Sequence, residues 1–284
     1  MSKWVFKKRF RRGGQAEIWF VQDPVLGTEF VAKCLLPDWS DADEGHDPKE
    51  RLRRLQREVR TQRDLSYEHP GIMPITATEF DAEPPYFVMP RATESLGDVM
   101  QRNPGGMNPD LAIQIILTAC DAIGYAHSRF VLHRDISPGN IMLLKGRWVV
   151  GDFGLALDRS TNSTTFTRTH HNHGTLPYMA PEQYDNAHDV GPEADVHALG
   201  RLLYHMLTGV VPFPRPPVID LLPAEFREVV ATAMALEPQD RYREVIGFSG
   251  RLRASAVGWR LRPPVAEMRP ATARVTEPAL SSVE

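Results

Sequence analysis

The sequence has few cysteines and no long hydrophobic run. Its 284 residues include two cysteines, Cys34 and Cys120, which are far apart and lack the paired spacing of a zinc site. Both lie in apolar surroundings, so we expect no disulfide framework and a reducing, cytoplasmic location. No apolar run approaches the roughly 18 residues of a membrane span. The basic N-terminus is not followed by an apolar stretch, so we expect no secretory signal.

A strong charge of one sign is also absent. The formal net charge is −3, from 33 basic and 36 acidic residues, which argues against wholesale nucleic-acid binding. The charge is uneven, however, because residues 1–12 hold six basic side chains and no acid, whereas residues 38–47 (DWSDADEGHD) are acidic. We interpret the basic segment as a solvated strand edge, with a phosphate-facing role as the alternative. The acidic segment is typical of an exposed loop.

The apolar pattern divides the chain into a strand-rich first part and a helix-rich second part. Residues 3–36 alternate and are rich in Val, Phe, Ile and Trp, and residues 71–80 and 85–90 also resemble strands. The join lies near residues 90–93, and the chain after about Pro263 has the composition of a frayed tail. The predicted helices cover residues 48–65, 109–129, 193–208, 223–236 and 240–254.

A polar loop between two apolar runs holds the clearest chemistry. In VLHRDISPGNIMLL (131–144), Asp135 and Asn140 are five residues apart on a Pro-Gly loop. The carboxylate can accept a proton from a hydroxyl, and the amide oxygen can coordinate a hard cation such as Mg²⁺. Alone the pattern is weak, because a polar loop with an aspartate is usually only a loop.

Other parts of the sequence strengthen this interpretation. Asp152 follows the strand-like RWVVG and precedes Phe153 and Gly154, which suits a second metal-binding carboxylate. Lys33 lies on a predicted strand among apolar neighbours (FVAKCL), where an ammonium is costly unless it is paired or bound to phosphate. Glu58, on the arginine-rich helix, is a candidate partner for it.

In this order the motifs resemble those of the protein kinase superfamily, from about residue 4 to about residue 260. The resemblance implies an α+β, bilobal fold. We expect a β-rich N-lobe with one main helix (1–92), a mostly helical C-lobe (93–262) and a disordered tail (263–284). The chain is similar to the serine/threonine type, and to bacterial members in its compact lobes and its Gly-Gly phosphate loop.

The resemblance assigns chemical roles to the matching residues. Asp135 is the expected catalytic aspartate, Lys33 the residue that grips the α- and β-phosphates of ATP, and Glu58 its partner. Asn140 and Asp152 are the expected ligands of Mg²⁺, with Mn²⁺ as an alternative metal.

The resemblance also implies an adenine site and a set of supporting residues. Met89 is the expected gatekeeper of a hinge at 90–92, although ordinary core packing also explains Met89 and Met142. The expected ATP-binding residues are Gly13, Gly14, Ala32, Lys33, Met89, Pro90, Ala92 and Met142. The expected supporting residues are Arg134, Glu182, Asp195 and Arg241, together with Thr175, which matches the threonine that serine/threonine kinases place beside the catalytic aspartate.

Three departures from the family pattern leave other functions open. The phosphate loop RRGGQAEIW has Arg11 and Ala16 at positions where the family has glycine. Ser137 stands where serine/threonine kinases usually have lysine, and the segment 214–220 is too short for the usual docking helix. One alternative is therefore a pseudokinase, a nucleotide-binding or interaction module with weak or no transfer activity. Another is a small-molecule kinase of related fold.

The expected function is transfer of the γ-phosphate of ATP to serine or threonine hydroxyls of protein substrates. Residues 160–175 hold seven Ser/Thr before Gly174, and Thr167 and Thr169 resemble in placement the paired activation-loop threonines of bacterial members. We expect autophosphorylation at one or both, the alternative being a merely polar loop. The histidines of HHNH (170–173) lack an accompanying cysteine or carboxylate and indicate loop polarity rather than a metal site.

Overall fold

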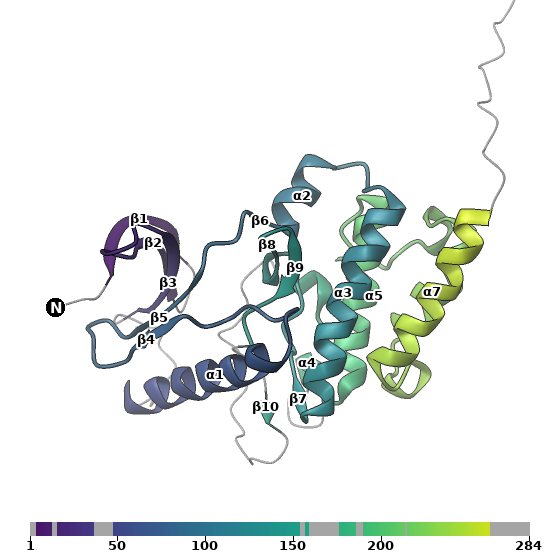
Figure 1. The fold of residues 1–284 in the computed structure, drawn as a ribbon. Coiled ribbons are helices and arrows are strands. Elements are labelled where there is room, and N and C mark those ends of the chain that lie inside the picture. The colour runs from purple at the N-terminus through teal and green to yellow at the C-terminus, as the bar shows by residue number, and fades with distance from the viewer. Residues whose placement is uncertain are drawn as a thin grey trace, which may run out of the picture.

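The first part of the chain forms an antiparallel sheet with one long helix beside it, as predicted (Figure 1). The computed structural model describes residues 4–12, 16–36, 48–153, 157–158, 176–185, 190–213 and 215–261. The strands are β1 (Val5–Arg12), β2 (Ala16–Gln22), β3 (Glu29–Leu35), β4 (Ala77–Glu79) and β5 (Tyr86–Pro90), and the helix is α1 (Pro48–Glu68). The sheet order is β1-β2-β3-β5-β4, and every neighbouring pair is antiparallel.

Alternation along β3 places Lys33 on the face of the sheet that α1 covers. Ala32 is buried in an apolar cluster on one face, and successive side chains of a strand point to opposite faces. Lys33 therefore points the other way, and it pairs across the sheet with Phe87, which packs against Leu55 and Val59 of α1. Burial of each such apolar side chain contributes about 1.5–3 kcal/mol. Docking of this apolar stripe, more than intrinsic propensity, therefore holds α1 in place.

The second part of the chain is mostly helical (Figure 1). Its helices are α2 (Leu96–Arg102), α3 (Pro109–Ser128), α4 (Glu182–Asp185), α5 (Pro192–Thr208), α6 (Ala224–Ala233) and α7 (Val245–Leu261). Its short strands are β6 (Glu94–Ser95), β7 (Val131–Leu132), β8 (Ile141–Leu144), β9 (Arg147–Val150) and β10 (Leu157–Asp158). They form a sheet of order β6-β8-β9 and an antiparallel pair of β7 with β10. Residues 91–93 connect this part to β5.

Helix α3 is the centre of the large apolar core. The side chain of Asn108 caps its first turn by accepting hydrogen bonds from the backbone N–H groups of Asp110 (2.9 Å) and Leu111 (3.3 Å). Ile115 and Ile123 are among its fully buried residues, and they pack in one cluster with residues of α5, α6 and α7. By length and a mean hydropathy of 1.2, α3 could also cross a membrane. Its place in the core accounts for that composition.

The predicted helices form within a few residues of their expected bounds, except the last. Residues 240–254 were predicted as helical, but α7 begins at Val245 and ends at Leu261. Residues 238–240 form a 3₁₀ turn, and Arg241 is extended because its side chain is held by tertiary hydrogen bonds. Within the strand predicted at 71–80, β4 covers residues 77–79 alone. Strand β9 forms in the strand-like segment RWVVG, whereas the short strands β6, β7, β8 and β10 and the helices α2 and α4 were not predicted individually.

Helix α7 packs against this core, so truncation of one of its buried side chains tests how much this packing contributes to the free energy of unfolding. Phe248 is fully buried, whereas Ile246, two residues earlier, is 73% exposed. Phe248→Ala should cost about 3–5 kcal/mol of the free energy of unfolding. Ile246→Ala is the matched control and should change it by less than about 0.5 kcal/mol. Urea unfolding followed by circular dichroism measures both, and equal effects would contradict the described packing.

Candidate active site

A charged cluster joins three segments at the face of the first sheet that α1 covers. The Nζ of Lys33, on β3, lies 2.6 Å from Oδ1 of Asp152 and 3.3 Å from Oε1 of Glu58, on α1. Burial by itself lowers the pKa of Lys33, but the two carboxylates outweigh burial and raise that pKa above its ordinary value. The structure therefore brings these three residues together around a charged ammonium.

The backbone around Asp152 is tied to neighbouring segments. Its φ is +64°, in the left-handed region that few residues other than glycine adopt. The N–H of Gly151 donates to the backbone carbonyl of Asn140 at 2.9 Å, which links this segment to the polar loop. Burial raises the pKa of Asp152, but the charge of Lys33 outweighs it and leaves this pKa below its ordinary value. The carboxylate is ionised and 37% exposed, so it can meet a ligand from solvent.

Within the polar loop, the side chain of Asn140 is hydrogen-bonded to Asp135. The Nδ2 of Asn140 donates to the backbone oxygen of Asp135 at 2.7 Å and to its carboxylate Oδ2 at 3.1 Å. Because the amide nitrogen makes both bonds, the amide oxygen of Asn140 is left to accept or coordinate another group. Asn140 is the last residue of a 3₁₀ turn, and its backbone N–H donates to the carbonyl of Ser137 at 3.0 Å. Ser137 is buried.

A buried carboxylate on α5 positions this loop. Asp195 is 1% exposed and accepts hydrogen bonds from the backbone N–H groups of His133 (2.9 Å) and Arg134 (2.8 Å). The Nε2 of His127 lies 2.8 Å from the same carboxylate. Burial raises the pKa of Asp195, but these hydrogen bonds and the nearby histidines lower it below its ordinary value. Arg134 has a φ of +64°, a strained conformation that the two N–H bonds stabilise.

His133 connects the polar loop to the segment of Asp152 and was not identified from the sequence. Its Nδ1 lies 3.2 Å from the backbone N–H of Asp135, and its Nε2 lies 3.1 Å from the carbonyl of Gly151. Burial lowers the pKa of His133, so the ring is neutral. The contacts then require the proton on Nε2, which donates to Gly151 while Nδ1 accepts. The ring also packs against Phe153, with centroids 4.6 Å apart.

Gln62 was also missed, although its spacing offered a signal. It is four residues after Glu58, on the same side of α1, at a place where an apolar side chain is expected. It is buried, and its Nε2 donates to the carbonyl of Met73 at 2.9 Å. Its Oε1 accepts from the backbone N–H of Phe153 at 3.4 Å. Gln62 thus links α1 to the residue that follows Asp152.

Glu182 and Arg241, two of the expected supporting residues, form a bidentate ion pair with N–O distances of 2.7 and 2.9 Å. The guanidinium of Arg241 is fully buried and also donates from Nε to the carbonyl of Ala235 at 2.7 Å. Gln183, next to Glu182, donates to the carbonyl of Arg134 at 2.9 Å. The pair is therefore connected to the loop that carries Asp135.

The candidates for the adenine site lie on two sheets. Ala32 is buried on β3, Met89 and Pro90 end β5, and Met142 lies on β8 against Gly151. Ala92 lies between β5 and β6. Gly13, Gly14, Thr167, Thr169 and Thr175 lie outside the described residues.

The architecture is that of a bilobal protein kinase, with a small antiparallel sheet and one docked helix followed by a mostly helical region. The paired lysine and the polar loop lie where that architecture has its active site. The family model of the protein kinase domain matches residues 27–250, so the chain belongs to the protein kinase family.

Relatives of this chain include serine/threonine kinases of Mycobacterium tuberculosis. The chain is 30% identical over 303 aligned residues to the serine/threonine-protein kinase PknA, covering 99% of this chain and 67% of PknA. It is 33% identical over 255 residues to PknB, covering 81% of this chain and 39% of PknB. A crystal structure of the PknI kinase domain matches with a TM-score of 0.68 and 24% identity, over 90% of this chain and 96% of that domain. At this identity the PknI likeness supports the fold alone.

The lowered pKa of Asp195 predicts how its contribution to stability depends on pH. Asp195→Asn should cost about 3 kcal/mol at pH 7, because an amide accepts these charge-assisted hydrogen bonds poorly. Since the pKa is lowered in the folded protein, the contribution is present above the ordinary value of 3.8 and is lost as the pH falls through the folded value. The difference in the free energy of unfolding between wild type and Asp195→Asn should therefore narrow as the pH falls below about 4. Urea unfolding at a series of pH values measures it.

Asp121→Asn serves as the control, because this carboxylate is 74% exposed on α3. Its effect should stay below about 0.5 kcal/mol at each pH. If the loss of unfolding free energy caused by Asp195→Asn were as large at pH 3 as at pH 7, the assigned charge state of Asp195 would be wrong.

Proposed function

We propose that this chain is an ATP-dependent serine/threonine protein kinase that transfers the γ-phosphate to protein hydroxyls. The observation that carries the proposal is the cluster of Lys33 with Glu58 and Asp152, connected through Gly151 and Asn140 to the loop of Asp135. Two buried free cysteines also support the proposed cytoplasmic location.

The residues suit phosphoryl transfer because this reaction requires alignment and charge compensation more than covalent help. Asp135 has a carboxylate that can orient an acceptor hydroxyl and take its proton. Lys33 carries a fixed positive charge for the phosphates of the nucleotide, and Glu58 keeps that charge in position. Asp135 is held by Asn140, so its side chain does not have to be ordered when substrate arrives.

The residues present fit a divalent metal ion. Asp152 offers an ionised, partly exposed carboxylate, and Asn140 offers an amide oxygen that its own amide hydrogen bonds leave available. Oxygen donors of this kind are what Mg²⁺ prefers. Such an ion, when bound, neutralises charge on the phosphates. Asn140 and Asp152 are the residues that would hold it.

Substitution of the two aspartates separates their roles. Asp135→Asn should lower the rate of transfer at least about a hundredfold, because the proton acceptor is lost. Nucleotide binding should stay largely intact, because the amide keeps the shape of the side chain. Asp152→Asn should also lose Mg²⁺-dependent nucleotide binding. Transfer is measured with labelled ATP and binding with a fluorescent ATP analogue.

Asp121→Asn provides the control for these variants as well. Near-normal phosphorylation by either aspartate variant would contradict the assigned roles. Wild-type protein that binds nucleotide and transfers nothing would instead support the pseudokinase alternative.

Phosphorylation of the segment that follows Asp152 is the second part of the proposal. Arg134, next to Asp135, is 5% exposed, and its NH2 group donates to the carbonyl of Val190 at 3.3 Å. A desolvated guanidinium interacts strongly with phosphate, which can accept two hydrogen bonds from it. Thr167 and Thr169 are the proposed acceptors, because of their spacing from Gly174 in GTLPY (174–178).

The double variant Thr167→Ala/Thr169→Ala tests this switch. We expect lower activity than that of the phosphorylated wild type, since the added charge is missing. Mass spectrometry after incubation with ATP identifies the modified residues, and a peptide phosphorylation assay gives the rate. Thr118→Ala, on α3, is a control outside the segment. Full activity of the double variant, equal to that of phosphorylated wild type, would rule the switch out.

A further inference from the structure

The basic strand β1 presents its arginines to two different faces of the first sheet. Arg12 pairs across the sheet with Glu17, and Glu17 pairs with Cys34, which is buried on the face opposite α1. Side chains of directly opposed residues lie on the same face of an antiparallel sheet. The Oε1 of Glu17 lies 2.9 Å from Nη1 of Arg9 and 3.8 Å from Nε of Arg12. These two arginines therefore lie on the outer face and already have an acidic partner.

Arg11 points to the other face, in one row with Lys33. It pairs with Ile18 of β2, Ile18 pairs with Lys33 of β3, and Lys33 pairs with Phe87 of β5. Because directly opposed residues share a face, the side chain of Arg11 lies on the side of the sheet that carries Lys33. Opposed Cα atoms are about 5 Å apart, which places the Cα atoms of Arg11 and Lys33 about 10 Å from each other.

The side chain of Arg11 is exposed, and among the described residues it forms no hydrogen bond or ion pair. Its charge nevertheless acts on the second part of the chain. Hydrogen bonds from Ser95 are the main reason why the pKa of Asp98, on α2, lies below its ordinary value. The positive charges of Arg102 and Arg11 lower this pKa further. The guanidinium of Arg11 therefore lies near the boundary between the sheet and the helical region.

The candidate active site is short of positive charge. The ammonium of Lys33 is paired with the carboxylates of Glu58 and Asp152, and the linked polar loop adds the carboxylate of Asp135. Ser137, two residues after Asp135, is buried and neutral. A nucleotide brings further negative charge on its phosphates, and phosphoryl transfer depends mainly on alignment and charge compensation. A second cation on the face of Lys33 meets that requirement.

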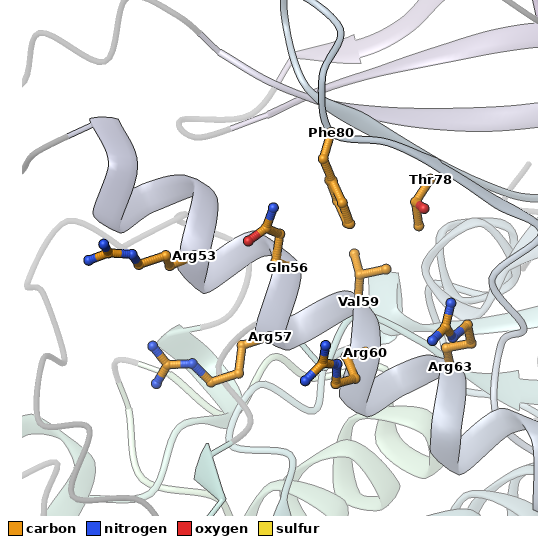
Figure 2. A pocket seen from close by; sticks show the side chains of 8 residues that line it. All are labelled: Arg53, Gln56, Arg57, Val59, Arg60, Arg63, Thr78 and Phe80. Atoms are coloured by element: carbon orange, nitrogen blue, oxygen red, sulfur yellow. The ribbon is translucent and has the colours of Figure 1, made fainter.

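Two exposed arginines of α1, Arg60 and Arg63, face another part of the surface. They line a hollow with Thr78 of β4, and Figure 2 shows both of them beside this hollow. Glu58, which contacts Lys33, is two residues from Arg60, or about 200° around the helix. Arg60 therefore lies on the side of α1 away from Lys33.

Lys8 shares the face of Lys33 but lies in a different row. It pairs with Phe20, and Phe20 pairs with Val31, which is two residues before Lys33 on β3. Two residues of a strand span about 7 Å, so Lys8 is displaced by that distance along the sheet. Arg11 is thus the basic residue of β1 that lies in the row of Lys33.

We propose that Arg11 binds the phosphates of the nucleotide together with Lys33. The guanidinium presents a planar fork of N–H donors, which makes two parallel hydrogen bonds with a phosphate. The resemblance places a glycine at this position, so the contact comes from a side chain that the family pattern does not contain. The inference rests on the proposed function and adds a phosphate-binding residue to it.

The test compares binding of ATP and of adenosine to the full chain by isothermal titration calorimetry. Arg11→Ala should lower the affinity for ATP at least about tenfold, because a charge-assisted pair of hydrogen bonds is lost. Its affinity for adenosine, which has no phosphate, should stay within about twofold of wild type. Circular dichroism checks that each variant is folded.

Two matched controls remove a positive charge from the same strand. Arg12→Ala changes the neighbouring residue on the outer face, and Lys8→Ala changes a residue on the face of Lys33 but in another row. Both should keep their affinity for ATP and for adenosine within about twofold of wild type.

Two further substitutions at the same position test the chemistry of the contact. Arg11→Lys keeps the charge and loses the fork, so it should recover at least half of the loss in the logarithm of the ATP affinity. Arg11→Gly restores the glycine of the family pattern and should bind ATP as weakly as Arg11→Ala. ATP binding by Arg11→Gly that is as tight as that of wild type would overturn the proposal.

The remaining outcomes separate this inference from the proposed function. Wild type that binds no ATP would overturn both. ATP binding by wild type, with equal affinities for Arg11→Ala and Arg12→Ala, would overturn the inference alone. An equally large loss of adenosine affinity in Arg11→Ala would show that this residue supports the shape of the site, and it would also overturn the phosphate contact.

A last variant tests whether Arg11 acts through α2 instead. Asp98→Asn removes the negative charge that Arg11 influences, and it should not lower the affinity for ATP. An equal loss in Asp98→Asn and Arg11→Ala, with no further loss in the double variant, would assign Arg11 to an interaction with Asp98. That result would overturn the proposal.

Discussion

The ammonium of Lys33 can be buried only where carboxylates meet it, and this requirement holds three segments of the molecule together. An unpaired buried ammonium costs several kcal/mol. Glu58 and Asp152 remove that cost, and in doing so they tie α1 and the segment after β9 to the central strand β3. The carboxylate of Asp152 keeps an exposed side even while it is paired. The same interaction therefore sets the position of the helix and leaves a charged group ready for a ligand.

A second constraint acts on the backbone of the polar loop. Left-handed backbone at residues such as Arg134 and Asp152 costs on the order of 1–3 kcal/mol and persists only where surrounding contacts enforce it. At Arg134, Asp195 accepts a hydrogen bond from the backbone N–H, and Gln183 donates one to the backbone carbonyl. His133 joins this loop to the segment of Asp152 through a neutral ring with a defined proton position. The two strained points are thus parts of one hydrogen-bonded network, which is how two loops far apart in sequence keep a common geometry.

Much of the fold could be predicted because its long helices repeat apolar residues with a clear period. Helix α3 and helix α5 form within one residue of their predicted bounds. The two-residue strands could not be predicted, since they exist only through hydrogen bonds to a distant partner strand. Helix α7 begins later than predicted because Arg241 has extended backbone, which lets its side chain reach Glu182 and three backbone carbonyls. This contact depends on Glu182, which is 59 positions away, so it cannot be predicted from the local periodicity of apolar residues.

Residue types and their order along the chain were enough to identify a lysine on a strand, a glutamate on a helix and an aspartate and asparagine on one loop, because each pattern is local. Which of these groups touch was decided by the packing of whole elements. Lys33 and Asp152 are 119 residues apart, and Gln62 and Phe153 are 91 apart. The apolar stripe of α1 is likewise visible in the sequence, but the cluster it joins exists only because Phe87 of β5 and Phe80, after β4, pack against it. Such contacts follow from burial of apolar faces, which brings distant segments to fixed distances and so decides which polar groups can meet.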